Sequence, residues 1–324
     1  MRLLLCALLL LAPLTAQPDL NARIEEWKKE LARNPKDFGP LFNLGLAYFN
    51  QKRPGEAIEM LKRAAAVSPQ DFNTRYLLGA AHSQIQQTED AIRAWRSAAK
   101  IQPANAKLLQ LLVVEYGKGR YFNEAAAAAG RALQLNPNDP NAYFLAIKAN
   151  QDAGDMETGA DIAAKAAAKF PNSARANMEH GFYLQLRGDL DQSMMYFKKS
   201  IELDPKYEEP PFFLADLLVK QEDYAAAIPY LNAAIACRTD YVPARVLRAR
   251  VLMNLERWQD AIKELETTIA MDPRHPQPHL MLSQIYFRQG NEAKAKQERD
   301  LSLKLRRENP TVLEATQGRP FTEK

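Results

Sequence analysis

Apolar and polar residues alternate along most of the chain with the spacing of amphipathic helices. In residues 38–71, the first half carries Leu41, Leu44 and Tyr48 at helical intervals, and a second apolar stripe runs through Leu61. A proline-containing turn closes the window. The pattern predicts two helices of about 12–15 residues each, joined by a short turn.

This window recurs seven more times at a constant interval of 34 residues, without insertion or deletion, as far as Asn309. Because the residue before a proline is disfavoured in helical conformation, a proline at the closing position ends the second helix of a window. Seven of the nine closing positions hold proline: Pro35, Pro69, Pro103, Pro137, Pro171, Pro205 and Pro273. Small residues fill a second column, where they let two helices approach closely: Ala57, Ala91, Ala125, Gly159, Ser193, Ala227, Ala261 and Ala295.

The interval, the Leu44-Gly45…Tyr48 run, the small-residue columns and the closing prolines together resemble the tetratricopeptide repeat family. The resemblance covers residues 38–309. It implies an all-α solenoid of tandem helix-turn-helix repeats, wound into a right-handed superhelix with the first helices on its concave face. In such an array each repeat buries its apolar faces only by stacking on its neighbours.

Four segments are expected. Residues 1–16 have the basic start, short apolar core and small-residue cleavage site of a secretory signal peptide. Residues 17–37 are predicted to form an N-terminal cap helix, residues 38–309 the eight repeats, and residues 310–324 a flexible C-terminal tail. The mature chain is expected to have no membrane-spanning segment and to be exported, either to a periplasm or to the extracellular space.

Charge and cysteine content narrow the choice of partners. The balance of 43 basic against 39 acidic residues gives no sign of nucleic-acid binding. Cleavage at the predicted site would leave Cys237 as the remaining thiol, so no disulfide could form within the chain. We expect Cys237 to be a buried bystander, with an intermolecular bridge as the alternative.

The sequence contains no glycine-rich phosphate loop, metalloprotease helix motif or paired cysteines, so we expect no catalytic residues and no cofactor. His275 and His279 are the best metal candidates, because four-residue spacing can place two imidazoles on one helix face. Prolines surround both, and a surface turn is the favoured interpretation. The prediction is therefore no metal site.

A protein-binding groove is the favoured functional feature. The resemblance places positions two, five, nine, twelve and thirteen of each repeat on the concave face, where aromatic, cationic and amide side chains suit recognition of a protein segment. The alternative is that some of the rings pack between neighbouring first helices. The predicted groove residues are Phe42, Tyr76, Lys107, Gln110, Phe144, Lys148, Arg175, Phe182, Phe212 and Arg250.

Some members of the family hold a terminal carboxylate with a lysine at position five and asparagines at position nine. This sequence has neither at those positions, so the clamp is not expected here. We therefore predict a non-catalytic, exported scaffold of bacterial type that binds a protein or peptide partner. Two alternatives stay open: an enzyme or a small-ligand or metal binder that uses the groove, and a membrane-peripheral component that uses the basic C-terminal helix.

Residues 120–170 are predicted to be the least stable part of the array. Their second helices are rich in alanine, which buries little area, and Gly130 costs about 1 kcal/mol within a helix. Amide hydrogen exchange should therefore be faster in residues 120–170 than in the repeats on either side. Equal protection in all three regions would contradict this prediction.

Overall fold

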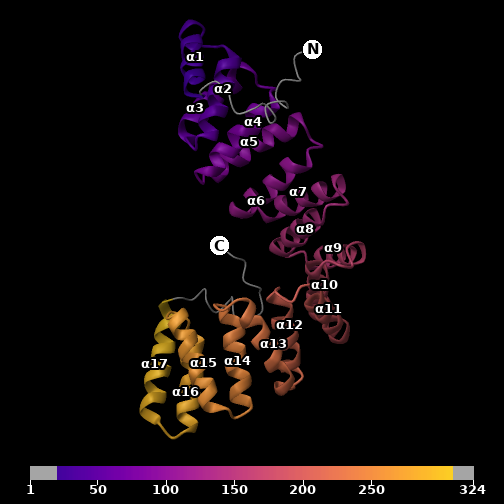
Figure 1. The fold of residues 1–324 in the computed structure, drawn as a ribbon, viewed down its shortest axis with the longest axis vertical. Helices are drawn as coiled ribbons and strands as arrows, with labels where there is room; N and C mark the ends of the chain where they lie inside the picture. The colour runs from indigo at the N-terminus through magenta and orange to yellow at the C-terminus, as the bar shows by residue number, and fades with distance from the viewer. Residues whose placement is uncertain (1–19, 309–324) are drawn as a thin grey trace, which may run out of the picture. The chain divides into compact units, whose positions relative to one another are not determined.

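The computed structural model describes residues 20–308, which form helices joined by short turns and contain no strand (Figure 1). The prediction of an all-α repeat fold is confirmed. A first helix, α1 (Leu20–Arg33), precedes eight helix pairs, and each pair lies in one 34-residue window. The pairs are α2 (Phe38–Asn50) and α3 (Pro54–Val67); α4 (Phe72–Gln84) and α5 (Thr88–Ile101); α6 (Ala106–Lys118) and α7 (Phe122–Leu135); α8 (Pro140–Ala153) and α9 (Met156–Lys169); α10 (Ala174–Arg187) and α11 (Leu190–Leu203); α12 (Glu209–Lys220) and α13 (Tyr224–Cys237); α14 (Val242–Asn254) and α15 (Trp258–Met271); α16 (Pro276–Arg288) and α17 (Glu292–Glu308).

Side-chain caps start many of the first helices. Asp71 accepts a hydrogen bond from the backbone N–H of Thr74 at 2.7 Å, and Asn105 accepts one from Leu108 at 3.0 Å. Such caps satisfy N–H groups that have no partner within the helix, and losing one costs about 1 kcal/mol. The cap residue closes one window and the helix opens the next, so the cap sets where each repeat begins.

The turn inside each pair has a left-handed residue at the same place in every repeat. Glycine occupies this place in three repeats, and in the other five a larger residue adopts the conformation with φ between 56° and 62°. The eight residues are Lys52, Gln86, Arg120, Gly154, Gly188, Glu222, Glu256 and Gly290. Since non-glycine residues rarely adopt positive φ, the regular spacing shows that packing of the helix pair imposes this turn.

Two helices of a pair meet where a glycine faces a large side chain. A Cβ added at Gly79 would lie 2.4 Å from Cδ1 of Trp95, and one added at Gly181 would lie 2.9 Å from Cε1 of Phe197. Both large side chains are buried. The indole of Trp95 also donates a hydrogen bond to the backbone carbonyl of Tyr76 at 2.9 Å. The absence of a Cβ at Gly79 and Gly181 therefore leaves the space that the rings of Trp95 and Phe197 fill.

The third and fourth repeats reverse this arrangement. Val113 and Ile147 occupy the place of the glycines, and Ala129 and Ala163 occupy the place of the large side chains. All four residues are buried. A larger residue on the first helix thus compensates for a smaller one on the second, which keeps the interior filled.

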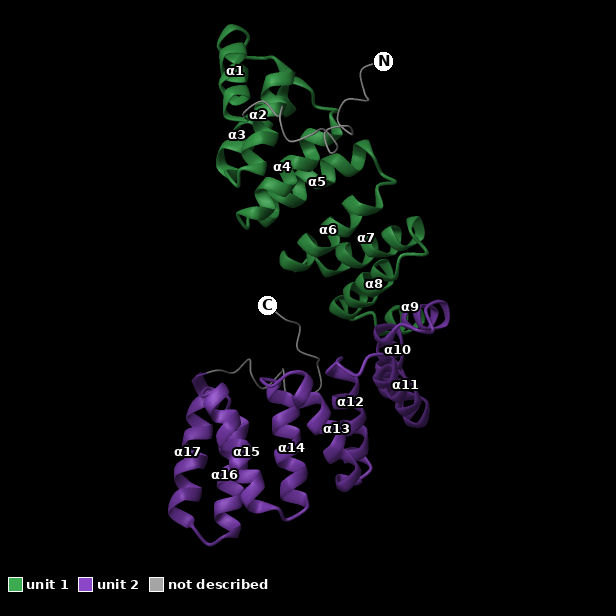
Figure 2. Ribbon diagram, viewed as in Figure 1, with its two compact units in different colours: residues 1–162 green, residues 163–324 purple. Residues whose placement is uncertain are grey.

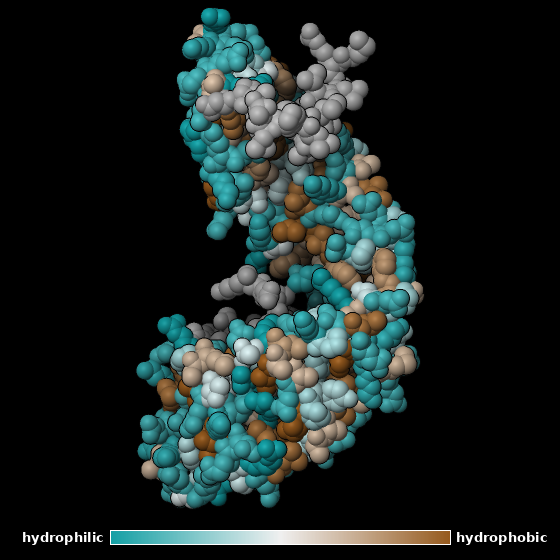
Figure 3. Space-filling model, in the orientation of Figure 1, coloured by the Kyte–Doolittle hydropathy of each residue, from teal (hydrophilic) through white to brown (hydrophobic). Residues whose placement is uncertain are grey.

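The chain divides into two compact units, residues 1–162 and 163–324, with the boundary inside α9 (Figure 2). Unit 1 has a core of apolar residues from α1 to α5, among them Leu41, Leu44 and Leu61. Unit 2 has a comparable core around Leu265 and Ile285. Polar residues cover much of the visible surface, with scattered apolar patches (Figure 3).

Replacing Gly79 by alanine should lower the free energy of unfolding by about 1–3 kcal/mol, because the added methyl group would overlap the buried ring of Trp95. Gly130→Ala is the matched control, since no atom lies within 4 Å of a Cβ added in that helix. The control should stabilise the protein by up to about 1 kcal/mol. Urea unfolding would measure both. Equal effects of the two substitutions would show that close approach at Gly79 is unimportant.

Candidate functional site

All ten predicted groove residues lie on the first helices of their repeats, and they fall into two sets. Unit 1 contains six of them, on α2, α4, α6 and α8: Phe42, Tyr76, Lys107, Gln110, Phe144 and Lys148. Unit 2 contains four, on α10, α12 and α14: Arg175, Phe182, Phe212 and Arg250. We consider each set within its own unit.

In unit 1 the aromatic rings differ in exposure. Phe42 and Tyr76 are half-buried. Their rings lie 5.8 Å from those of Phe38 and Phe72, the first residues of the same helices. Phe144 is only 7% exposed, so its ring packs between helices, as the alternative interpretation of the pattern anticipated. Phe42 and Tyr76 are therefore the rings of this set with surface left for a ligand.

The polar members of the unit 1 set also differ. Lys107 is exposed. The side-chain amide of Gln110 donates a hydrogen bond to Oδ2 of Asp139 at 3.1 Å, which holds its orientation. Lys148 pairs with Asp152 one turn later in α8. Lys107 thus offers an accessible positive charge, and Gln110 offers an amide in a defined direction.

The unit 2 set contains a cluster of packed rings. Phe182 is 7% exposed and lies 5.5 Å from Phe213, while Phe212 lies 5.2 Å from Tyr241. Phe182 therefore belongs to the packing between first helices, whereas Phe212 stays half-buried.

The two arginines of the unit 2 set are both exposed. The Nε atom of Arg175 lies 3.6 Å from Oε1 of Glu179, one turn further along α10. Arg250 lies on α14. Their guanidinium groups can bind carboxylates or main-chain carbonyls of a partner.

Two polar clusters on the first helices lie outside the ten predicted groove residues. In unit 1, Ser83 donates a hydrogen bond to Oε2 of Glu115 at 2.9 Å, and Lys118 donates to the same oxygen at 2.9 Å. Glu115 is 1% exposed, and its Oε1 atom has no hydrogen-bond partner. A buried carboxylate needs such partners, because desolvation otherwise disfavours its charge.

The matching cluster in unit 2 lies three repeats later. The amide of Gln185 donates to Oδ2 of Asp216 at 3.1 Å, and Lys220 lies 2.7 Å from the same oxygen. In both clusters a polar side chain on one first helix reaches a carboxylate on the next. The available signal was an acidic residue three or four positions before a lysine on a first helix, a spacing that brings the two side chains together.

A buried ion cluster joins three helices of unit 2. Glu264 of α15 is 7% exposed, and its Oε1 atom lies 2.8 Å from Arg245 of α14. Arg248 of α14 binds the other carboxylate oxygen and also donates to Asn232 of α13 at 2.9 Å. Removing one partner of a buried pair is strongly destabilising, so this cluster holds the three helices in register.

The expectation that Cys237 is buried was wrong. It is exposed at the end of α13, where its thiol donates to the carbonyl of Pro205 at 3.3 Å. Burial of part of the thiol still raises its pKa, so the thiolate is disfavoured.

The interpretation of His275 and His279 as a surface turn was also wrong, because both are buried. Nδ1 of His275 accepts a hydrogen bond from the backbone N–H of Gln277 at 3.3 Å and so caps α16. Nδ1 of His279 lies 2.7 Å from Oε2 of Glu298 on α17. Within residues 20–308, no three His, Cys, Asp or Glu side chains are arranged to hold a metal ion.

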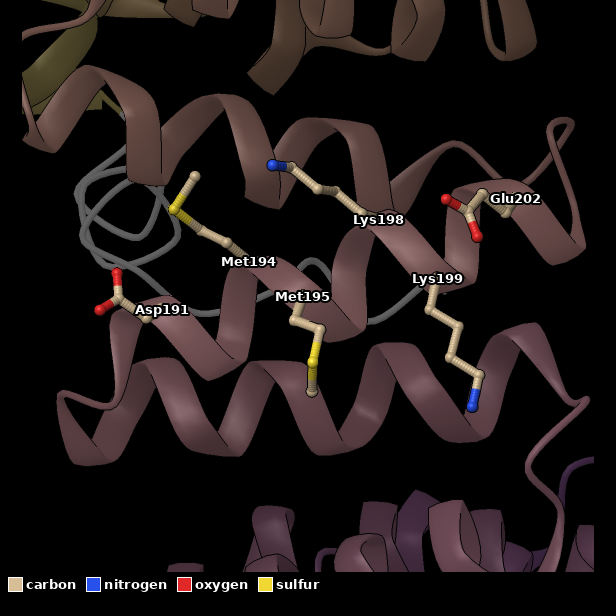
Figure 4. A pocket seen from close by; sticks show the side chains of 6 residues that line it. All are labelled: Asp191, Met194, Met195, Lys198, Lys199 and Glu202. Carbon is tan, nitrogen blue, oxygen red and sulfur yellow. The ribbon is translucent and has the colours of Figure 1, made fainter.

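Six side chains of α11 line an open hollow on its surface (Figure 4): Asp191, Met194, Met195, Lys198, Lys199 and Glu202. All six come from one helix, so this is a helix face rather than an enclosed ligand cavity. Among the described residues, no helix is long and apolar enough to span a bilayer.

Comparison with protein families agrees with the repeat architecture. Residues 39–71 and 246–298 match two family models, each described as tetratricopeptide repeat. Residues 187–268 match the model described as anaphase-promoting complex, cyclosome, subunit 3. These matches cover parts of the chain and agree with its repeated helix pairs.

Two curated proteins resemble parts of the chain. Anaphase-promoting complex subunit 3 of Schizosaccharomyces pombe is 24% identical over 174 residues, which are 52% of this chain and 25% of that protein. Tetratricopeptide repeat protein 6 of Homo sapiens is 26% identical over 202 residues, covering 59% of this chain and 37% of that protein. The chain thus spans between a quarter and two fifths of the length of these relatives.

A solved tetratricopeptide repeat protein from Parabacteroides merdae shares the fold. It aligns with a TM-score of 0.57 at 17% identity, covering 82% of this chain and 98% of the other. Identity this low supports similarity of fold alone.

Lowering the pH should reduce the stability of the last helix pair, because His275 becomes protonated. Burial lowers the pKa of His275, Asp272 opposes this shift, and His279 adds to it. Because the folded-state pKa is below the ordinary value of 6.5, the stabilising effect is complete above pH 6.5 and is lost as the pH falls through the folded-state pKa. Protonated Nδ1 cannot accept the Gln277 hydrogen bond, and loss of a cap costs about 1 kcal/mol.

The measurement is hydrogen exchange of α16 amides at neutral and acidic pH, at matched intrinsic exchange rates. His275→Asn is the matched control, since its amide oxygen can cap the helix without titrating. The asparagine variant should lose less protection in acid than the natural protein. If both lose the same amount, His275 does not control the stability of α16.

Proposed function

We propose that this protein is a non-catalytic, exported scaffold that binds a segment of a partner protein on the first helices of its repeats. The observation that carries the proposal is the row of accessible groups on successive first helices of unit 1. Phe42 of α2 and Tyr76 of α4 are half-buried, and Lys107 of α6 is exposed.

The chemistry of this row suits an extended polypeptide. Aromatic side chains contribute large apolar contacts at little entropic cost, and lysine binds carboxylates or carbonyls. The side chain of Gln110 is held by Asp139, so its remaining amide capacity can meet a main-chain group without first being ordered. A partner segment crossing α2, α4 and α6 would contact these groups in turn.

The class of fold favours binding over catalysis. One relative bears the name of a subunit of a multiprotein complex, the anaphase-promoting complex, which is consistent with a repeat array that holds other proteins. Export rests on the composition of residues 1–16, which lie outside the described residues.

Charge reversal at Lys107 should reduce partner capture about tenfold, because an interface residue of this kind contributes about 1–2 kcal/mol. The experiment compares natural protein and Lys107→Glu as bait in quantitative pull-downs from the native envelope and secreted fractions. Tyr76→Ser should give a similar loss.

The control is Lys62→Glu, which makes the same charge change at an exposed position on α3, a second helix. Capture by this control should equal that of the natural protein. Undiminished capture by both first-helix variants, or an equal loss in the control, would contradict binding on the first helices. Mass spectrometry of the purified native chain would test removal of residues 1–16.

A further inference from the structure

The twelfth position of a repeat contacts the first helix of the following repeat. Ser83 holds this position on α4 and hydrogen-bonds to Glu115 of α6 at 2.9 Å. Gln185 holds it on α10 and hydrogen-bonds to Asp216 of α12 at 3.1 Å. Both contacts cross from one helix pair to the next. A side chain at the twelfth position therefore marks the surface that a further helix covers.

In the last helix pair, two apolar residues are exposed at positions where the earlier repeats have buried or half-buried side chains. Phe287 of α16 stands three repeats after Gln185 and is 69% exposed. Leu303 of α17 stands two repeats after Ile235, which is 7% exposed, yet Leu303 is 46% exposed. Both side chains are thus more exposed than their counterparts in the earlier repeats. Large exposed apolar groups at positions built for helix packing indicate an interaction surface.

Exposed basic residues lie on α17 together with Leu303. Lys296 is exposed at the place where earlier repeats bury an isoleucine, as Ile58 shows with 8% exposure. Arg299 and Arg307 are exposed as well. Together with Leu303, these residues recur at intervals of three or four along α17, which puts them on one face of the helix.

The acidic residues of α17 compensate only part of this charge, since the helix has six lysines and arginines against four aspartates and glutamates. Asp300 lies 4.0 Å from Arg299, and both side chains are more than half exposed, so their contact stabilises little. Glu298 points to His279 of α16 at 2.7 Å. The sequence of α16 contains no acidic residue. The surface is therefore apolar in two places and positive around them.

We propose that this end face, made of Phe287, Lys296, Arg299, Leu303 and Arg307, binds an amphipathic acidic helix of a partner protein. The helix packs beside α16 and α17 as a following first helix does in the earlier repeats. Its apolar stripe covers Phe287 and Leu303, and its carboxylates lie near the three cations. This surface is separate from the first-helix row of unit 1, so either proposal can fail without the other.

The test uses the full chain and a fluorescein-labelled synthetic helix with a leucine stripe flanked by glutamates. The matched probe has lysines in place of the glutamates. In fluorescence anisotropy, the acidic probe should bind at least about tenfold more tightly than the basic one, and added salt should weaken it. Phe287→Ser and Lys296→Glu should each weaken binding about tenfold.

Met195→Ser is the control for loss of an exposed apolar side chain, since Met195 is 55% exposed on α11. It should leave binding unchanged. Circular dichroism would verify that Phe287→Ser keeps its helices, as expected for so exposed a residue. Equal binding of both probes, or unchanged binding by Phe287→Ser, overturns the proposal.

Two further results would also overturn it by identifying another occupant. If the acidic probe binds only after residues 309–324 are removed, the chain's own C-terminal segment covers the end face. If light scattering shows a dimer that Phe287→Ser converts to a monomer, a second copy of the chain covers it.

Discussion

The close approach of two helices within each pair is the constraint on which the rest of the structure depends. A Cβ at Gly45 would lie 2.6 Å from Cγ of Leu61, so a small residue on the first helix is the condition for a large one on the second. Repeats three and four meet the same condition in reverse, with Ile147 facing the position of Ala163. A larger residue on the first helix then accompanies a smaller one on the second, in keeping with a close-packed interior.

This packing decides which polar groups are available for function. Where first helices of neighbouring repeats meet, Glu115 and Asp216 are each held by partners from two helices. Within one helix pair, Glu264 of α15 is held by two arginines of α14. Such side chains contribute to register and leave little capacity for a ligand. Lys107 and Arg250 lie on the outer part of the same helices, where exposure leaves them available to a partner.

The two proposed surfaces use different positions of the repeat. The first-helix row of unit 1 uses positions that stacking leaves partly open in every repeat. The end face uses positions that stacking covers in the earlier repeats, as at Ile235, and leaves open at Leu303. Apolar side chains at corresponding positions are thus buried in an earlier repeat and exposed in the last described helix.

The sequence by itself determined the helix pairs and their 34-residue interval, because caps, prolines and apolar spacing act within a few residues. It also placed the groove candidates on the first helices. It did not determine exposure: Phe144 is covered and Phe42 is partly open, although both hold the same position. The burial of His275, the exposure of Cys237 and the left-handed turn at Lys52 were likewise decided by tertiary structure. Each depends on how neighbouring helices pack against one another, and the spacing of residues within one helix does not specify those contacts.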